Sequence, residues 1–277
     1  FYADDLNVVP GGVLNTVIAL RRLGINVGWM AKLGNDFFSD FIDHVVDSEG
    51  LDKSLLSRAP VPQRRVTVAL SYHEERAFVT YIDPVYKASA DLAVEALEHA
   101  TFSHLHFTGL TLDERLPDFF DRCHERGICV SMDCQYREQT LDMLLVRETV
   151  RRLDIFMPNA SEAQRLTRTE RLAEALDKLD NFVPYIVIKC GAEGALARRD
   201  GIDYHSPAVP ANVIDTTGAG DVFNAGFLAA HLAGKATLEC LRWGNYCASM
   251  SVQGVGGIST APTLSQLQAW LAAPPQA

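Results

Sequence analysis

The chain has 277 residues, 48% apolar and 22% charged, which is the composition of a globular protein with a full hydrophobic core. No apolar run approaches the roughly 20 residues of a membrane helix. The formal net charge of −10, without a basic cluster, disfavours nucleic acid and anionic membranes as partners. The six cysteines form no C-x-x-C pair and lack zinc-ligand spacing, so we expect reduced, mostly buried thiols in a cytoplasmic protein.

The first third of the chain alternates between helical and extended patterns and then changes character. The spacing of apolar residues predicts a helix over 12–23, a strand over 27–33 and a helix over 36–46. The runs 66–72 and 76–82 are rich in β-branched and aromatic residues and flank a short polar turn, which predicts a β-hairpin. Because the hairpin interrupts the α/β pattern, we expect it to lie outside the main sheet.

After the hairpin the alternation of strands and helices resumes. Strands are predicted at 105–107, 128–133, 155–157 and 185–189, with a strand-like run at 208–214 and a two-residue hairpin turn at Asp200 and Gly201. Helices are predicted at 117–126, 141–152, from 161 onwards, at 217–233 and at 239–252. This order predicts an α/β fold with a doubly wound, mainly parallel sheet and helices on both faces. Ligands of such sheets bind beyond the carboxyl ends of the strands.

The most informative segment is the sequence DTTGAGDVFN over 215–224, between the strand-like run and a helix. Gly218, Ala219 and Gly220 have almost no side chain, so their backbone N–H groups can approach a ligand closely at a helix N-terminus, where anions are favoured. Asp221 places a carboxylate beside this anion hole, as a base for phosphoryl transfer requires. We expect the helix N-terminus to keep this carboxylate ionised at pH 7. The alternative is a strand-to-helix turn whose aspartate only caps the helix.

Five segments, in order along the chain, resemble the motifs of the ribokinase (PfkB) family of carbohydrate kinases. They are PGGVLN with ALRRLG at 10–24, LGND at 33–36, PNASE at 158–162, IKCGAEGA at 188–195 and DTTGAGDVF at 215–223. The resemblance implies a ribokinase-like fold and ATP-dependent phosphorylation of a hydroxyl on a small sugar-like molecule.

The same resemblance implies a role for each matching residue. The catalytic group would be the base Asp221 with the anion hole of Gly218, Ala219 and Gly220, and the substrate would contact Gly11, Gly12, Asn15 and Arg137. The nucleotide would lie along Lys189, Gly191 and Gly194 with Asn245 near the adenine. Asn159 and Glu162 would organise Mg²⁺ through water, and Asp215 with the Thr217 carbonyl would bind a monovalent cation such as K⁺.

The resemblance also implies one kinase domain over 1–277 with a β lid from about 1–10 and 64–84, through which two subunits would pair.

Three departures from the family pattern stand out. The glycine pair lies two residues from Asn15 instead of three, no strand ending in a sugar-binding aspartate precedes Pro10, and Gln135 stands where the family has asparagine. Asp4 and Asp5 are poor substitutes for that aspartate. Arg137 is equally well explained as a surface arginine in a salt bridge.

Other classes of protein fit the sequence less well. A dinucleotide-dependent oxidoreductase is disfavoured because no G-x-G-x-x-G follows a first strand. A non-catalytic sugar- or nucleoside-binding member of the same fold, and a kinase of a nucleoside or vitamin alcohol, remain alternatives. His104 and His106 share a strand face, but the sequence offers no third ligand at useful spacing, so a metal pair there is disfavoured.

Overall fold

The computed structural model describes residues 6–72, 75–84, 89–135 and 138–273. The chain divides into two compact units. The larger consists of Phe1–Asn26 and Thr101–Ala277, and the smaller is Val27–Ala100. Each unit is described by itself.

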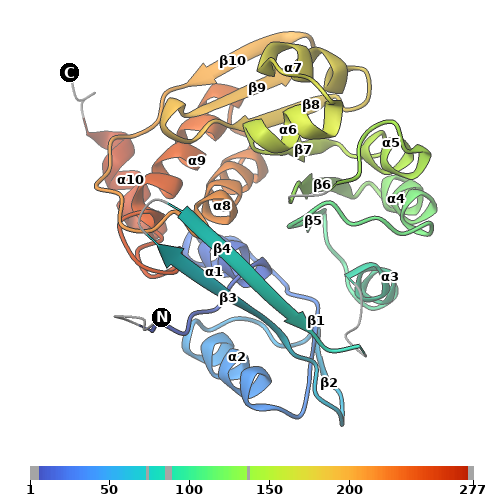
Figure 1. Ribbon diagram of the computed structural model, residues 1–277, viewed down its shortest axis with the longest axis vertical. Helices are drawn as coiled ribbons and strands as arrows, with labels where there is room; N and C mark the ends of the chain where they lie inside the picture. The colour runs from blue at the N-terminus through green and yellow to red at the C-terminus, as the bar shows by residue number, and fades with distance from the viewer. Residues whose placement is uncertain (1–5, 73–74, 85–88, 136–137, 274–277) are drawn as a thin grey trace. The chain divides into compact units, whose positions relative to one another are not determined.

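The larger unit is built on a six-stranded sheet with the order β10-β9-β8-β7-β6-β5 (Figure 1). Its parallel strands are β5 (His104–Phe107), β6 (Cys129–Asp133), β7 (Ile155–Met157) and β8 (Tyr185–Lys189). The strands β9 (Ala195–Arg199) and β10 (Ile202–Ser206) continue it as an antiparallel hairpin. Asp200 and Gly201 form the hairpin turn with φ of 54° and 71°, as predicted. The mainly parallel sheet is thereby confirmed.

Helices cover both faces of this sheet. Those on one face are α8 (Ala219–Leu232) and α9 (Thr237–Ser251), and α6 (Ala160–Thr167) and α7 (Leu172–Asp180) lie on the other (Figure 1). The remaining helices of the unit are α1 (Val13–Arg22), α4 (Leu116–Glu125), α5 (Leu144–Val150) and α10 (Leu264–Ala272), with a short 3-10 turn, η1 (Gly191–Glu193). The helix α1 packs against α8, which brings the N-terminal glycine motif to the start of α8.

Two parts of the larger unit differ from the sequence prediction. The run 208–214 forms no strand, because Pro207 and Pro210 lack the N–H groups that a sheet ladder needs. Val213 and Ile214 are exposed instead, and Ile214 donates one backbone hydrogen bond to Val252. The helix α10 was not predicted, although Thr263 and Gln266 form the capping box that its T-x-x-Q sequence encodes.

The smaller unit contains a two-stranded parallel sheet of β1 (Ala31–Leu33) and β2 (Leu56–Arg58). The predicted strand over 27–33 is therefore shorter than expected, and Gly28 contributes only an isolated bridge. The helix α2 (Phe37–Ser48) starts at Asp36, whose carboxylate accepts a hydrogen bond from Ser39 N. The unit also contains α3 (Ser89–His99), which the sequence analysis did not predict.

The predicted hairpin is confirmed as β3 (Arg65–Tyr72) and β4 (Glu75–Ile82), which form an antiparallel sheet of their own. The middle of its turn, residues 73 and 74, lies outside the described residues. The described residues 6–10 form no strand, and Asp4 and Asp5 lie outside the described part. The lid role of 1–10 and 64–84 therefore stays a prediction.

Candidate functional site

The helix α8 begins in a glycine turn that also touches α1. Gly218 is the N-terminal cap residue with a left-handed φ of 75°, which glycine adopts without strain. A Cβ at Gly218 would lie 2.6 Å from Asn15 Nδ2, so a larger residue would clash there. The turn is thus closely packed against Asn15.

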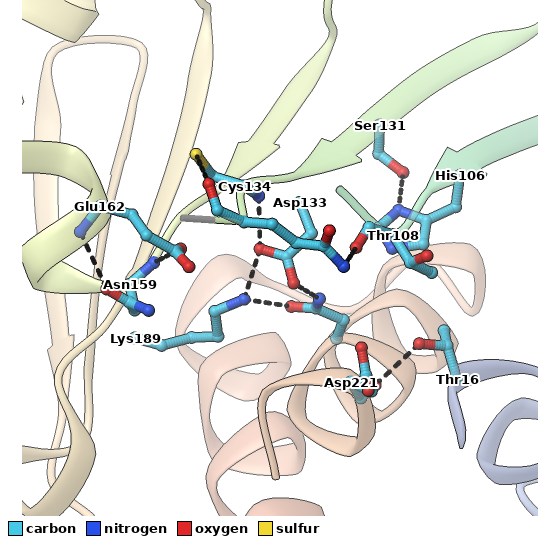
Figure 2. A network of polar contacts seen from close by, with 12 residues as sticks. Thr16, His106, Thr108, Ser131, Asp133, Cys134, Asn159, Glu162, Lys189 and Asp221 are labelled. Atoms are coloured by element: carbon cyan, nitrogen blue, oxygen red, sulfur yellow. Dashed lines mark hydrogen bonds and ion pairs between the residues drawn. The ribbon is translucent and has the colours of Figure 1, made fainter. Parts of the chain in front are cut away.

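Asp221, in the first turn of α8, is bound by two residues of α1. Asn15 Nδ2 donates to Asp221 Oδ2 at 3.2 Å. The Thr16 hydroxyl donates to the Asp221 backbone carbonyl at 3.3 Å, a contact that Figure 2 shows. Asn15 is buried, and its Oδ1 has no hydrogen-bond partner among the described residues. The structure therefore brings the predicted base and the predicted substrate contact together and leaves a buried acceptor beside the carboxylate.

The charge state of Asp221 differs from the sequence expectation. Burial raises the pKa of Asp221 to about 7, and the charge of Asp133 adds to the effect, while Asn15 and Lys189 oppose it. Desolvation thus outweighs the helix N-terminus, which was expected to keep the group fully ionised. A carboxyl with a pKa near 7 exchanges its proton readily at neutral pH, as suits a general base.

A buried polar network lies next to Asp221 at the carboxyl ends of β6 and β8. Lys189 Nζ is 2.6 Å from Asp133 Oδ1, and Asn224 Nδ2 donates to Asp133 Oδ2 at 2.6 Å (Figure 2). Lys189 Nζ also donates to Asn224 Oδ1 at 3.3 Å. A Cβ on Gly220 would meet Lys189 Nζ at 3.7 Å, so the ammonium group lies beside the glycine turn.

Asn159 and Glu162 form the capping box of α6. Glu162 N donates to Asn159 Oδ1 at 2.9 Å, and Asn159 N donates to Glu162 Oε2 at 2.8 Å. Burial raises the pKa of Glu162 to about 7, and the charge of Asp133 acts in the same direction. The motif thus has a local structural function, and its carboxyl lies close enough to Asp133 for their charges to interact.

Asp215 ties together two backbone segments near the start of α8. Its carboxylate accepts hydrogen bonds from Thr217 N and Gly256 N, each at 2.9 Å. A Cβ at Gly257 would lie 2.4 Å from the Thr217 carbonyl oxygen. These contacts place Asp215 and the Thr217 carbonyl in one loop assembly, and the monovalent-cation role stays a prediction.

Three of the four predicted nucleotide residues, Gly191, Gly194 and Asn245, lie at one pair of loops. Gly194 has a φ of 91°, and a Cβ there would lie 2.1 Å from the Ser206 carbonyl, so only glycine fits this approach. Asn245 Nδ2 donates to the carbonyls of Ser206 and Pro207 at 2.9 and 3.0 Å. Gly191, in the η1 turn, completes this loop pair. Asn245 thus positions the loop through its amide group.

The other predicted substrate contacts are less constrained. Gly12 is the N-terminal cap residue of α1, and the carbonyls of Gly11 and Gly12 accept from Leu14 N and Asn15 N. Both glycines have open space where a side chain would be. Arg137 lies outside the described residues.

Sequence reasoning assigned no site role to Asp133, Asn224 or Thr16. Asp133 lies two residues before Gln135, one of the departures from the family pattern. Asn224 is three residues after Asp221, which places it on the same side of α8. The spacing of Asp221 and Asn224 is therefore visible in the sequence. The pairing of Asp133 with Lys189 is not, because the two residues are 56 positions apart.

Comparison with known proteins identifies the family of the chain. The family model of the pfkB family carbohydrate kinases matches residues 2–264. The chain is 28% identical to 2-dehydro-3-deoxygluconokinase of Bacillus subtilis, over 96% of this chain and 87% of that one. It is likewise 28% identical to aminoimidazole riboside kinase of Salmonella typhimurium, over 95% and 88%.

Solved structures show the same fold. A putative ribokinase II from E. coli superposes with a TM-score of 0.79 at 22% identity, covering 98% of this chain and 93% of that one. A fructokinase from Vibrio cholerae, in its fructose-, ADP- and calcium-bound form, has a TM-score of 0.76 at 25% identity, covering 95% and 91%. The fold and the family match define a phosphotransferase with an alcohol group as acceptor. The chain belongs to the pfkB family of carbohydrate kinases, as its motifs predicted.

Proposed function

We propose that this protein transfers the γ-phosphoryl group of ATP to a hydroxyl of a small sugar or sugar-like molecule, with Asp221 as the general base. The observation that carries the proposal is the position of Asp221. It is a partly buried carboxyl in the first turn of α8, directly after the Gly218–Gly220 turn. Its Oδ2 accepts a hydrogen bond from Asn15 Nδ2, and the other amide atom of that residue, Oδ1, is a buried acceptor without a partner among the described residues.

The proposed reaction follows from these contacts. A substrate hydroxyl beside Asp221 would donate to its carboxylate, while Asn15 Oδ1 would accept from a second hydroxyl. As the new P–O bond forms, the proton of the reacting hydroxyl passes to Asp221. The backbone N–H groups of the Gly218–Gly220 turn would stabilise the charge on the transferred group.

The network behind this turn would hold Lys189 in place for an incoming phosphate group. Lys189 lies beside Gly220 and is held by Asp133 and Asn224, so its position is fixed before a phosphate arrives. The ammonium group would then balance phosphate charge at no cost of reorganisation.

The carboxyls near α6 fit a divalent cation. Glu162 and Asp133 interact unfavourably in the buried site, which is one cause of the raised pKa of Glu162. Glu162 and Asn159 would hold Mg²⁺ through its water ligands. When bound, the ion neutralises charge on the ATP phosphates.

A coupled ADP-release assay with a panel of acceptors tests the proposal. The panel holds ribose, fructose, a keto-deoxy sugar acid, nucleosides, a glycated amine and a vitamin alcohol, because curated relatives act on several such classes: they include a 2-dehydro-3-deoxygluconokinase, a cytidine kinase and fructokinases. One acceptor should give ATP-dependent turnover. If no acceptor gives turnover although one of them binds in calorimetry, the protein is a non-catalytic sugar- or nucleoside-binding member of the fold.

The first prediction concerns Asp221→Asn. The amide keeps the shape and accepts no proton, so kcat should fall by about 10²–10⁴-fold while ATP and the acceptor still bind. Calorimetry measures binding and ADP release measures turnover. Asp118→Asn, at an exposed position of α4, is the matched control and should keep the parental kcat. Turnover of Asp221→Asn within about threefold of the parent, far below a general-base effect, would show that Asp221 only caps α8.

A further inference from the structure

A second group of chemically active side chains lies at the opposite end of α8 and of the sheet. His104 and Cys129 are the first residues of β5 and β6, and they pair directly in the parallel register. His231 is in the last turn of α8, ten residues after Asp221. At 1.5 Å per residue the helix separates His231 from the catalytic base by about 15 Å. The cluster is therefore distinct from the kinase site.

The three side chains converge on one point. One ligand atom from each of His104, Cys129 and His231 lies within 4.8 Å of the other two, and it is the only such group of three among the residues described. Around a tetrahedral Zn²⁺ the ligand atoms are about 3.3–3.8 Å apart, as follows from Zn–N distances near 2.0–2.1 Å and Zn–S near 2.3 Å. Side-chain rotations that move each atom by about 1 Å would close the site.

The hydrogen bonds around His104 leave one ring nitrogen for a ligand. His104 Nε2 is 2.7 Å from Ser131 Oγ, which is also 2.8 Å from His106 Nδ1 (Figure 2 shows the latter pair). His104 Nδ1 is buried and has no hydrogen-bond partner within the described ranges. If His104 Nε2–H donates to Ser131, the lone pair of Nδ1 is left for a ligand. A bonded outer nitrogen is the usual partner arrangement of metal-binding histidines.

The surroundings carry charge of both signs, since Arg199 acts on His231 and Asp154 acts on Cys129. His231 lies at the C-terminus of α8, where the helix carries partial negative charge. Its ring is fixed between Phe227, at 6.4 Å and nearly parallel, and Tyr185, at 6.0 Å. The carboxylate of Asp154, whose Oδ2 accepts from Val130 N at 2.7 Å and lies 3.1 Å from His124 Nε2, supplies a negative charge near Cys129.

We propose that His104, Cys129 and His231 form a binding site for a thiophilic divalent cation of the Zn²⁺ type, separate from the Mg²⁺ of the kinase reaction. One imidazole, one thiolate and a second imidazole are ligands that select Zn²⁺ over Mg²⁺, which prefers oxygen. A fourth position remains for water. On binding, the Cys129 sulfur gives its proton to solvent and forms the metal–sulfur bond.

The test uses the full-length, reduced protein titrated with Co²⁺ and Zn²⁺ in the presence of excess Mg²⁺. We expect one equivalent to bind and Co²⁺ to give a thiolate-to-metal charge-transfer band. Cys129→Ser and His231→Gln should each weaken binding by more than about 100-fold, since loss of an outer partner alone costs about 10–100-fold. Ser131→Ala, which removes such a partner, should weaken it by about 10-fold.

The controls are Cys190→Ser, at the other half-buried cysteine, and His44→Gln, at an exposed histidine. Both should bind the metal as the parent does. Far-UV circular dichroism verifies that each variant is folded without metal. Binding that is unchanged in Cys129→Ser and His231→Gln, or a Co²⁺ spectrum without the charge-transfer band, would overturn the proposal.

A measurement on the unmodified chain keeps the test decisive if a variant does not fold. Zn²⁺ should slow alkylation of Cys129 by N-ethylmaleimide at least tenfold while leaving Cys190 unaffected, as read by peptide mass spectrometry. Equal alkylation of Cys129 with and without Zn²⁺ would also overturn the proposal.

Discussion

At the scale of single residues, the candidate site contains a buried ion pair. Lys189 and Asp133 are 2.6 Å apart, with 12% and 7% of their side chains exposed. Lys189→Met should lower the free energy of unfolding by about 3–5 kcal/mol, because it leaves the Asp133 carboxylate buried without its cation. The double variant Lys189→Met with Asp133→Leu should recover most of that loss. Urea unfolding measures both, and equal stabilities of the single variant and the parent would contradict the pairing.

At the scale of elements, the start of α6 combines a cap with a charged group. Glu162→Gln keeps an oxygen that can accept from Asn159 N, so the cap should survive while the charge is lost. We expect its stability to match the parent's at about pH 4, where Glu162 is protonated, and its half-saturating Mg²⁺ concentration at neutral pH to rise. Glu162→Ala loses both and should also be less stable by about 1 kcal/mol. A Mg²⁺ titration of Glu162→Gln that equals the parent's would mean that the residue is only a cap.

The hairpin is the second element with a testable consequence. Its register pairs Val68 with Val79 and Val66 with Tyr81, so these four share one face. Phe78 and Ile82, which pair with Ala69 and Arg65, lie on the opposite face. Val68 and Val79 are 51% and 62% exposed. Which residues share a face depends on the strand register, and a shift of one residue would reverse the two faces. Hydrophobic periodicity alone does not determine the register.

This exposed apolar face supports the predicted pairing of subunits through the hairpin. Val68→Arg should convert a dimer into a monomer, because it places a charge in the centre of the face. Thr67→Arg, on the opposite face, is the matched control and should stay dimeric. Light scattering at micromolar concentration measures both, and a monomeric parent protein would refute the pairing.

At the scale of the whole molecule, buried carboxyls should shape the dependence of stability on pH. Asp221 and Glu162 have pKa values raised from 3.8 and 4.5 to about 7 in the folded chain. The folded state therefore holds these protons more tightly, so their stabilisation is full below about pH 4 and is lost as the pH rises through about 7. Asp221→Asn removes one such group. Its melting temperature should exceed that of the parent at pH 8 and approach it at pH 5, and an equal difference at both pH values would contradict the raised pKa.

No helix in the described part of the chain is long and apolar enough to span a membrane. The chain splits into two compact units, and the candidate site and the proposed metal cluster both belong to the larger one. The helix α8 connects them within that unit, with the base in its first turn and His231 in its last. One helix thus carries a residue of the candidate kinase site at its start and a residue of the proposed metal site at its end.

The sequence by itself determined the local features of this protein. Periodicity located β7 and β8 to the residue, and the glycine segment marked the start of α8, because such signals depend on neighbouring residues alone. Family motifs then gave the class of enzyme. Tertiary structure decided what depends on burial and on distant partners. It paired Lys189 with Asp133, raised the pKa of Asp221 against its helix dipole, and joined His104 and Cys129 to His231, more than 100 positions away, because desolvation and ligand geometry exist only once the chain has folded.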